Sequence, residues 1–127
     1  MKTAYEIYRK SLALIGEAES EENLIFRERA VEVINLMLAE IYETDLALKG
    51  EDLPLDGTVP QIRDLSDRLN ISEVILFSLM PLGLAGYLLN EEEPNRSQFF
   101  LQLYQTEKEV LRTRCRRGRR HKIQRSI

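Results

Sequence analysis

The sequence predicts an all-α fold, a small bundle of four helices followed by a basic C-terminal arm. Apolar residues recur three and four positions apart along most of the chain, as one face of a helix requires. The composition combines 43% apolar residues with six glycines, four prolines and no tryptophan, which suits helices packed on helices better than a turn-rich β-sandwich. A length of 127 residues allows one domain with a thin core.

The first helix is expected over residues 3–15. Its apolar residues fall three and four positions apart and therefore share one stripe. They are Tyr5, Tyr8, Leu12 and Ile15. Gly16 follows at once, and glycine is the usual residue after the last turn of a helix because it adopts the left-handed conformation without strain. A helix this short is expected to dock on a longer one.

A long second helix is predicted to begin at Ser20, and its apolar residues keep a helical period from Leu24 to Lys49. Ser20 suits its N-cap, and the acids that follow complement the positive end of the helix dipole. Gly50 provides the stop, which leaves some twenty-five residues, or roughly 40 Å of helix. Val31 and Leu36 lie off the main apolar stripe. This extra apolar face is either core or a subunit interface.

The following segment, residues 51–70, is expected to be a loop, because two prolines and an Asp-Gly pair interrupt any helix. One helical turn is expected within it, over residues 62–69. A connection of this length in a compact domain is usually functional or mobile. As an alternative, Asp56 and Gly57 form the turn of a small β-hairpin.

A third helix is expected to begin at Ser72, which caps it, and to be the central helix. Its apolar residues from 74 to 80 are dense enough for burial on nearly all sides. Pro81 removes a backbone donor and clashes with the preceding turn, so the helix must end or kink there. The helical period resumes afterwards, which favours a kink. Gly83 and Gly86 then allow a neighbouring helix to approach closely.

Residues 90–93, three of them glutamates, form an acidic turn, and Pro94 suits the first position of a fourth helix. The buried stripe of this helix is expected to be Phe99, Phe100, Leu103, Tyr104, Val110 and Leu111. The helix runs toward the C-terminus, but its periodicity fades after Leu111, and Gly118 interrupts it. Residues 112–120 are therefore expected to be a frayed extension or an arm outside the core.

Charge divides the chain into two parts. Residues 1–111, the expected helical domain, carry twenty-one acids and ten bases, whereas residues 112–127 carry eight bases and no acid. The net charge of −3 thus joins a body at about −11 to a basic tail at about +8. Such a tail binds its own body or an acidic partner. The expected docking residues are Arg112, Arg114, Arg116, Arg117, Arg119, Arg120, Lys122 and Arg125.

Catalysis, cofactor binding and metal binding are not expected. His121 is the only histidine and lies in the basic tail, where nothing orients a general base. No glycine-rich phosphate loop or zinc-binding motif is present. Glu91, Glu92 and Glu93 are contiguous, so they point in different directions and suit a solvated helix end better than a cation site. Cys115, the single cysteine, is flanked by arginines that favour a thiolate, but an incidental free thiol is expected.

No membrane segment is expected either. The longest apolar stretch, residues 74–89, is interrupted by a serine, a proline and two glycines and is too short to cross a bilayer comfortably. The first fifteen residues alternate charged and apolar side chains, unlike a signal peptide. A soluble cytoplasmic protein without a small-molecule substrate is the expectation.

The basic tail also suits an arm for nucleic acid. Neutralising eight phosphates would give a slope of about −7 for the logarithm of affinity against the logarithm of salt concentration. The tail lacks aromatic residues to stack on bases, and the body has no convincing helix-turn-helix pair. Nonspecific phosphate binding is therefore the alternative to docking on an acidic protein surface, including the body of another copy.

Two neighbouring segments resemble small head–tail connector proteins of tailed bacteriophages and prophages. Those proteins have a kinked helix of the form Leu-Pro-Tyr-Gly-Leu-Ala, then an acidic turn and a helix ending in an aromatic-rich tyrosine motif. The corresponding residues are 80–89 and 97–104, with Met80 in place of the leucine and Leu82 in place of the tyrosine. The resemblance spans about twenty-five residues.

The resemblance implies a helical adaptor that assembles as a ring beneath the portal and joins it to tail-completion proteins. It implies no catalytic residues, and it places the protein in the virion neck, or in the host cytoplasm during assembly. In such rings a C-terminal arm often reaches toward the portal, which gives residues 112–125 a docking role. One heterologous interface, repeated, closes a ring, and many weak arms then act together.

Overall fold

The computed structural model describes residues 2–17, 24–52 and 54–125 of the chain, with side chains as far as Cys115 apart from those of residues 24 and 25. The helices are α1 (Ala4–Ile15), α2 (Leu24–Lys49), a π-helical turn η2 (Ile75–Leu79) that leads into α3 (Met80–Leu89), and α4 (Pro94–Arg125). Within the described residues there is no β-strand, only one isolated bridge between Thr3 and Arg68. The predicted all-α fold of four helices is confirmed.

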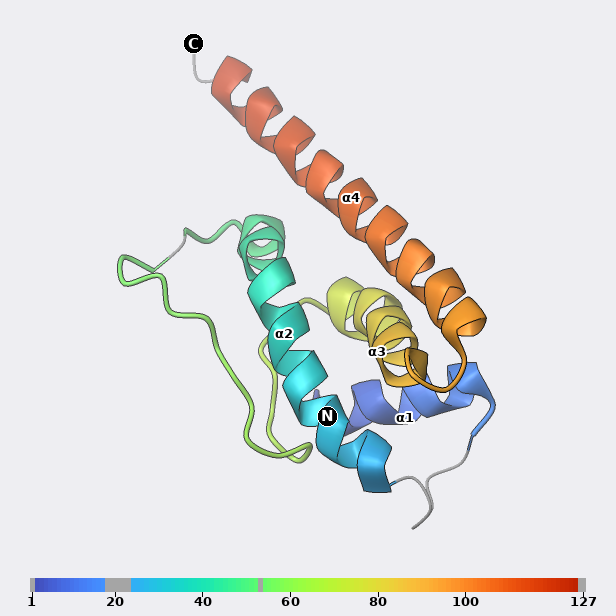
Figure 1. Cartoon of the computed structure of the whole chain (residues 1–127). Coiled ribbons are helices and arrows are strands. Elements are labelled where there is room, and N and C mark those ends of the chain that lie inside the picture. Colours follow the sequence, from blue (N-terminus) through green and yellow to red (C-terminus); the bar gives the residue numbers. More distant parts are fainter. Residues whose placement is uncertain (1, 18–23, 53, 126–127) are drawn as a thin grey trace.

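The third helix is central, as predicted. It contacts α1, α2 and α4, and its apolar residues belong to one cluster of buried side chains that includes residues from every helix. The loop after α2 adds Ile62, Leu65 and Leu69 to this cluster. In Figure 1, α4 packs along α3 with its first turns, and its C-terminal half extends beyond the body. The fold is thus a bundle with one projecting helix.

The ends of α1 have different partners. Gly16 ends the helix in the left-handed conformation with φ of +79°, as predicted. At the start, the backbone N–H groups of Ala4 and Tyr5 donate to the carbonyls of Asp67 and Leu65, at 3.1 and 2.7 Å. The loop therefore satisfies donors that a helix start leaves unpaired, where Thr3 makes no side-chain cap.

The second helix ends as predicted, because Gly50 follows Lys49 with φ of +73°. The predicted N-cap, Ser20, lies outside the described residues. The open question about its extra apolar face receives two answers. Val31 is half-buried and packs against the core, whereas the side chain of Leu36 is 51% exposed. Of these two residues, Leu36 alone is exposed enough to contact another molecule.

The loop contains turns but neither of the elements predicted in it. The backbone N–H of Gly57 donates to the Pro54 carbonyl at 3.0 Å, and that of Thr58 donates to Oδ1 of Asp56 at 3.0 Å. No strands flank this turn among the described residues, so the hairpin alternative is wrong. The Asp56 carboxylate accepts from the backbone N–H two residues ahead, which is the bond of an Asx-turn.

The helical turn expected over residues 62–69 is also absent. The Asp67 carboxylate instead accepts from the backbone N–H groups of Arg63 and Asp64, at 2.7 and 3.1 Å. These two bonds are the largest cause of the lowered pKa of Asp67, because they favour its charged form. The backbone N–H of Asp67 also donates to the Asp64 carbonyl at 3.1 Å, so the segment closes a hydrogen-bonded turn and not a helix.

Two polar side chains of α2 hold the loop. The Asn35 side chain donates to the carbonyl of Ile62 at 3.0 Å and accepts from its N–H at 2.8 Å. About 15 Å further along α2, by the rise of a helix, Asp45 accepts from the backbone N–H of Ser72 at 2.7 Å and pairs with Lys49 at 3.0 Å. Lys49 also donates to the carbonyl of Asn70. Both clamps fix the path into the third helix.

Pro81 is accommodated by a change of helix type. The helix continues through the proline to Leu89, as predicted, but the preceding turn is π-helical. There the N–H of Met80 donates to the Ile75 carbonyl, five residues back. A π turn is a known way to accommodate a disrupted α-helical ladder, and it often bends the helix.

The two glycines of α3 permit the predicted close approach of α4. A Cβ atom on Gly83 would lie 2.6 Å from Sδ of Met37 and 2.9 Å from the ring of Tyr104. A Cβ atom on Gly86 would lie 2.7 Å from the side chain of Leu101. Both gaps are below contact distance, so only hydrogen fits there. These positions set the distance between α3 and α4.

Candidate partner interface

The fourth helix has two apolar faces, and only one of them packs on the body. Phe100, Tyr104 and Leu111 are buried, as predicted. The other three residues of the predicted stripe are exposed: Phe99 by 59%, Leu103 by 38% and Val110 by 38%. Each exposed residue directly precedes a buried one, and successive residues are about 100° apart around a helix. The prediction of one buried stripe was therefore wrong for half of its members.

The exposed residues form a regular seam, which we call the α4 outer face: Phe99, Leu103, Thr106, Val110 and Thr113. Their spacing alternates between four and three, which is the spacing of the seam in a coiled coil. Beside the seam lie two shallow hollows of about 650 and 420 Å³. The larger is lined by Gln105, Thr106, Glu109, Val110, Thr113 and Arg114. Residues spaced in this way form the hole that receives a side chain from a packed partner.

The buried side of α4 is fixed by polar contacts as well as by packing. The buried Ser97 hydroxyl donates to the carbonyl of Gly86 at 2.7 Å. Lys108, also buried, pairs with Glu40 of α2 at 2.8 Å, and the Tyr87 hydroxyl donates to the same carboxylate at 3.4 Å. Burial and, secondarily, the charge of Glu40 raise the pKa of Tyr87. One carboxylate thus joins α2, α3 and α4, so the outer face has a rigid support.

The helix does not fray where its periodicity fades. Its backbone remains helical through Gly118 to Arg125, which corrects the expectation of a frayed extension and leaves a helical arm. Leu111 is the last buried side chain that the structure describes. At half-buried Cys115 the thiol still reaches the Thr44 carbonyl, at 3.9 Å. The arm therefore continues the packed helix without a hinge, and its direction is set by the body.

The eight predicted docking residues all lie on α4. Arg112 is half-buried and pairs with Glu109 at 2.7 Å. Arg114 is exposed and borders the larger hollow of the outer face. The side chains of the other six fall outside those described, and they are Arg116, Arg117, Arg119, Arg120, Lys122 and Arg125. Docking through these residues stays a prediction, and the apolar outer face beside them was not predicted, although its four-three spacing is visible in the sequence.

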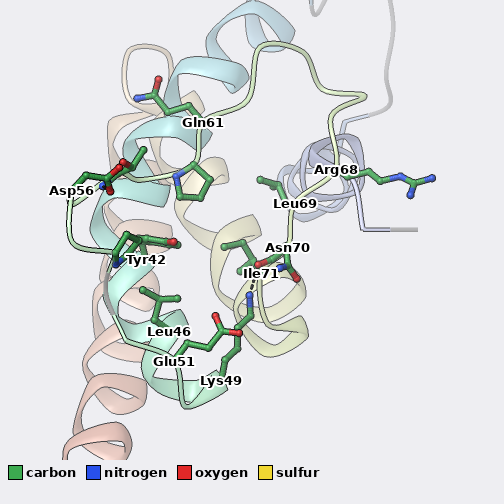
Figure 2. Close-up of a pocket in the computed structure, with 13 residues that line it drawn as sticks. Tyr42, Leu46, Lys49, Glu51, Asp56, Gln61, Arg68, Leu69, Asn70 and Ile71 are labelled. Carbon is green, nitrogen blue, oxygen red and sulfur yellow. Dashed lines mark hydrogen bonds between the residues drawn. The ribbon is translucent and has the colours of Figure 1, made fainter.

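Another hollow lies beneath the loop, away from the α4 outer face. Figure 2 shows it between α2 and the loop, with Tyr42 and Leu46 on one side and Leu69 and Ile71 on the other; its volume is about 630 Å³. Lys49, which reaches into this space, is already bound to a carboxylate and a carbonyl. The hollow separates residues 54–61 of the loop from α2, whereas Leu65 and Leu69, between the two clamps, are buried in the core.

Tyr104 provides a test of how tightly α4 is packed. Its ring is buried against Gly83, its hydroxyl has no hydrogen-bond partner among the described residues, and Lys108 Nζ lies 5.0 Å from the ring centroid. Burial first, and the charge of Glu40 second, raise the pKa of Tyr104 well above its usual value. The folded state therefore holds this proton where the unfolded chain, with a pKa near 10, releases it.

Stability from Tyr104 should be full below pH 10 and be lost as the pH rises further, at about 1.4 kcal/mol per pH unit. We expect Tyr104→Phe to remove this loss while changing the free energy of unfolding by less than about 1 kcal/mol at pH 7, because the hydroxyl is unpaired. Urea unfolding of both proteins at pH 7 to 11.5 measures the difference. If the free energy of unfolding fell equally with pH in both proteins, the raised pKa of Tyr104 would be contradicted.

The other candidate sites considered from the sequence were a metal site and a histidine-dependent site. Among the described residues, no three metal-ligating side chains come together, and Glu91, Glu92 and Glu93 are each exposed. The His121 side chain lies outside the described residues. No described helix is long and apolar enough to cross a membrane. No family model, curated protein or solved structure matches the chain.

Proposed function

We propose that the protein is a non-enzymatic structural adaptor of a phage or prophage head–tail connector. It forms a ring that joins the portal to tail-completion proteins, in the virion neck and, during assembly, in the host cytoplasm. The observation that carries this proposal is α4, whose unpartnered apolar face continues directly into a helical arm with eight basic residues. A helix with these two features serves to bind other macromolecules.

The arm is suited to docking because it is already ordered. As a helix, residues 112–125 extend about 20 Å, and the Glu40 and Cys115 contacts fix where the helix points. A partner pays little entropy to bind such an element, since its backbone need not be ordered on contact. Individual exposed ion pairs are weak, but a ring presents one arm from every copy at once. An acidic rim on a portal ring would meet all of them together.

The test uses a variant in which Arg114, Arg116, Arg117, Arg119 and Arg120 are all changed to Gln. Glutamine has nearly the helix propensity of arginine, so the arm stays helical while five charges are lost. At about 0.5 kcal/mol per ion pair, binding to the portal protein of the same phage or prophage should weaken by at least about 50-fold. Surface-immobilised portal rings give the affinity.

The matched control is the pair of body substitutions Arg29→Gln and Arg63→Gln, which should leave the affinity unchanged. Portal binding of equal strength by the arm variant and the natural chain would refute docking through the arm, and the absence of a portal gene nearby would refute the adaptor. If the arm variant loses only a salt-sensitive retention on duplex DNA, the arm serves phosphates instead.

A further inference from the structure

The tip of the loop presents one apolar side chain among acids. Leu55 is fully exposed, and it follows Pro54 in a turn closed by the bond from the Gly57 N–H to the Pro54 carbonyl. The nearest charged residues along the chain are Glu51, Asp52 and Asp56, with no base between positions 50 and 62. Hydrogen bonds from Thr58 keep the pKa of Asp56 below its usual range, so this group stays charged.

The α4 outer face offers the complementary features. Its larger hollow contains a four-residue hole, formed by Thr106, Glu109, Val110 and Thr113, of the kind that receives one side chain of a packed partner. Glu109, the acid at its edge, is paired with Arg112 at 2.7 Å. This pairing reduces the repulsion between Glu109 and an acidic segment of a partner. Arg114, exposed at the other edge, forms no ion pair with the residues that the structure describes.

The two surfaces lie on different sides of the molecule. In Figure 1 the loop projects on one side of α2, and α4 lies on the other side. The loop tip therefore cannot reach the α4 outer face of its own chain, but it can contact the α4 outer face of a second copy. Contacts between two different patches of identical subunits are heterologous, and they close into a ring when the rotation between subunits allows it.

We propose that the loop tip of one copy packs on the α4 outer face of the next copy. Leu55 enters the hole formed by Thr106, Glu109, Val110 and Thr113, and the acids around Leu55 face Arg114 and the arm. This contact is the subunit interface of the ring, so the inference rests on the function proposed above. The interface needs no portal residue, and free copies form it at high concentration.

Disulfide trapping tests the contact. Three single-cysteine chains are made in a Cys115→Ser background, carrying Leu55→Cys, Val110→Cys or, as a matched exposed control, Leu14→Cys of α1. Equal amounts are mixed pairwise at high concentration and oxidised. The mixture of Leu55→Cys with Val110→Cys should give at least about tenfold more linked dimer than any mixture containing Leu14→Cys, because contact raises the effective concentration.

A chain with both Leu55→Cys and Val110→Cys should give a ladder of linked oligomers. Asp52→Lys with Asp56→Lys in the Leu55→Cys chain should abolish the trapped dimer, and Arg114→Glu in the Val110→Cys chain should restore it. Yields no higher than the Leu14→Cys control would overturn the proposal. So would efficient linking of Val110→Cys to itself, which instead indicates two α4 helices packed face to face.

The two proposals fail separately. If trapping fails but the arm variant still loses portal binding, the adaptor stands and its ring interface lies elsewhere. If trapping succeeds but the portal is not bound, the chain forms rings and the adaptor function is wrong.

Discussion

Asp45→Ala is expected to lower the free energy of unfolding by about 3 kcal/mol. The Asp45 side chain is completely buried near the C-terminal end of α2. It accepts from the Ser72 N–H at 2.7 Å and pairs with Lys49 at 3.0 Å. Alanine leaves a backbone donor and a largely buried ammonium group without their partner, and each carries a desolvation cost.

The consequence should reach beyond α2, because Asp45 and Lys49 together hold the residues that lead into the third helix. Urea unfolding at pH 7 measures the loss. Asp45→Asn keeps an oxygen for the Ser72 N–H and should lose only about half as much. Glu43→Ala, at an exposed position two residues earlier, should change stability by less than about 0.5 kcal/mol. Equal losses of stability in Glu43→Ala and Asp45→Ala would contradict the role of Asp45 in holding the loop.

Gly86→Val should cost a similar amount, about 3 kcal/mol, through overpacking. A Cβ atom at this position meets the Leu101 side chain at 2.7 Å and its backbone nitrogen at 3.1 Å. The backbone cannot yield without moving α4 away from α3. That movement would also stretch the buried bond from Ser97 to the Gly86 carbonyl, which is 2.7 Å long.

The control for the intrinsic cost of valine in a helix is Ala39→Val, at an exposed site on α2, with an expected loss of about 0.5 kcal/mol. Gly86→Ala should fall between the two, since a smaller clash is partly offset by better helix propensity. Thermal and urea unfolding of the three variants rank them. A Gly86→Val protein as stable as Ala39→Val would show that α3 and α4 are not locked together.

The helices could be predicted from the sequence because their signals are local. Gly16 and Gly50 stop α1 and α2 by their own conformational freedom, and both adopt positive φ. Gly83 and Gly86 similarly revealed a close helix contact. The π turn before Pro81 was foreseen only as a kink, because the proline specifies a break in the hydrogen-bond ladder but not how neighbouring packing resolves it.

The loop could not be predicted in detail because its partners are distant in the chain. Asn35 and Asp45 each bind a backbone group twenty-seven residues away. A short window of sequence cannot show that a polar residue on a helix will bind a segment this distant in the chain. Such contacts form only after the chain has folded back, whereas the bonds found in place of the expected helical turn near residues 62–69 are local and come from Asp64 and Asp67.

The basic residues of the candidate interface were predicted from the sequence, but its exposed apolar face was not. Eight basic residues after Leu111 indicate an acidic partner from sequence alone. The neighbouring apolar pairs, such as Phe99 with Phe100 and Val110 with Leu111, produce two stripes on one helix. Periodicity shows that both stripes exist, but only the packing of α3 decides which becomes core and which stays exposed.

The most direct test of the proposed adaptor function is the mass of the particle that forms when the protein is mixed with a portal protein encoded in the same genome. Each copy weighs 14.8 kDa. Mass photometry of the purified mixture should show one new particle, heavier than the portal ring by a fixed multiple of that mass, and it should disappear when the five arm arginines are replaced by glutamine. Separate peaks for portal and free protein at saturating concentration would contradict the adaptor function.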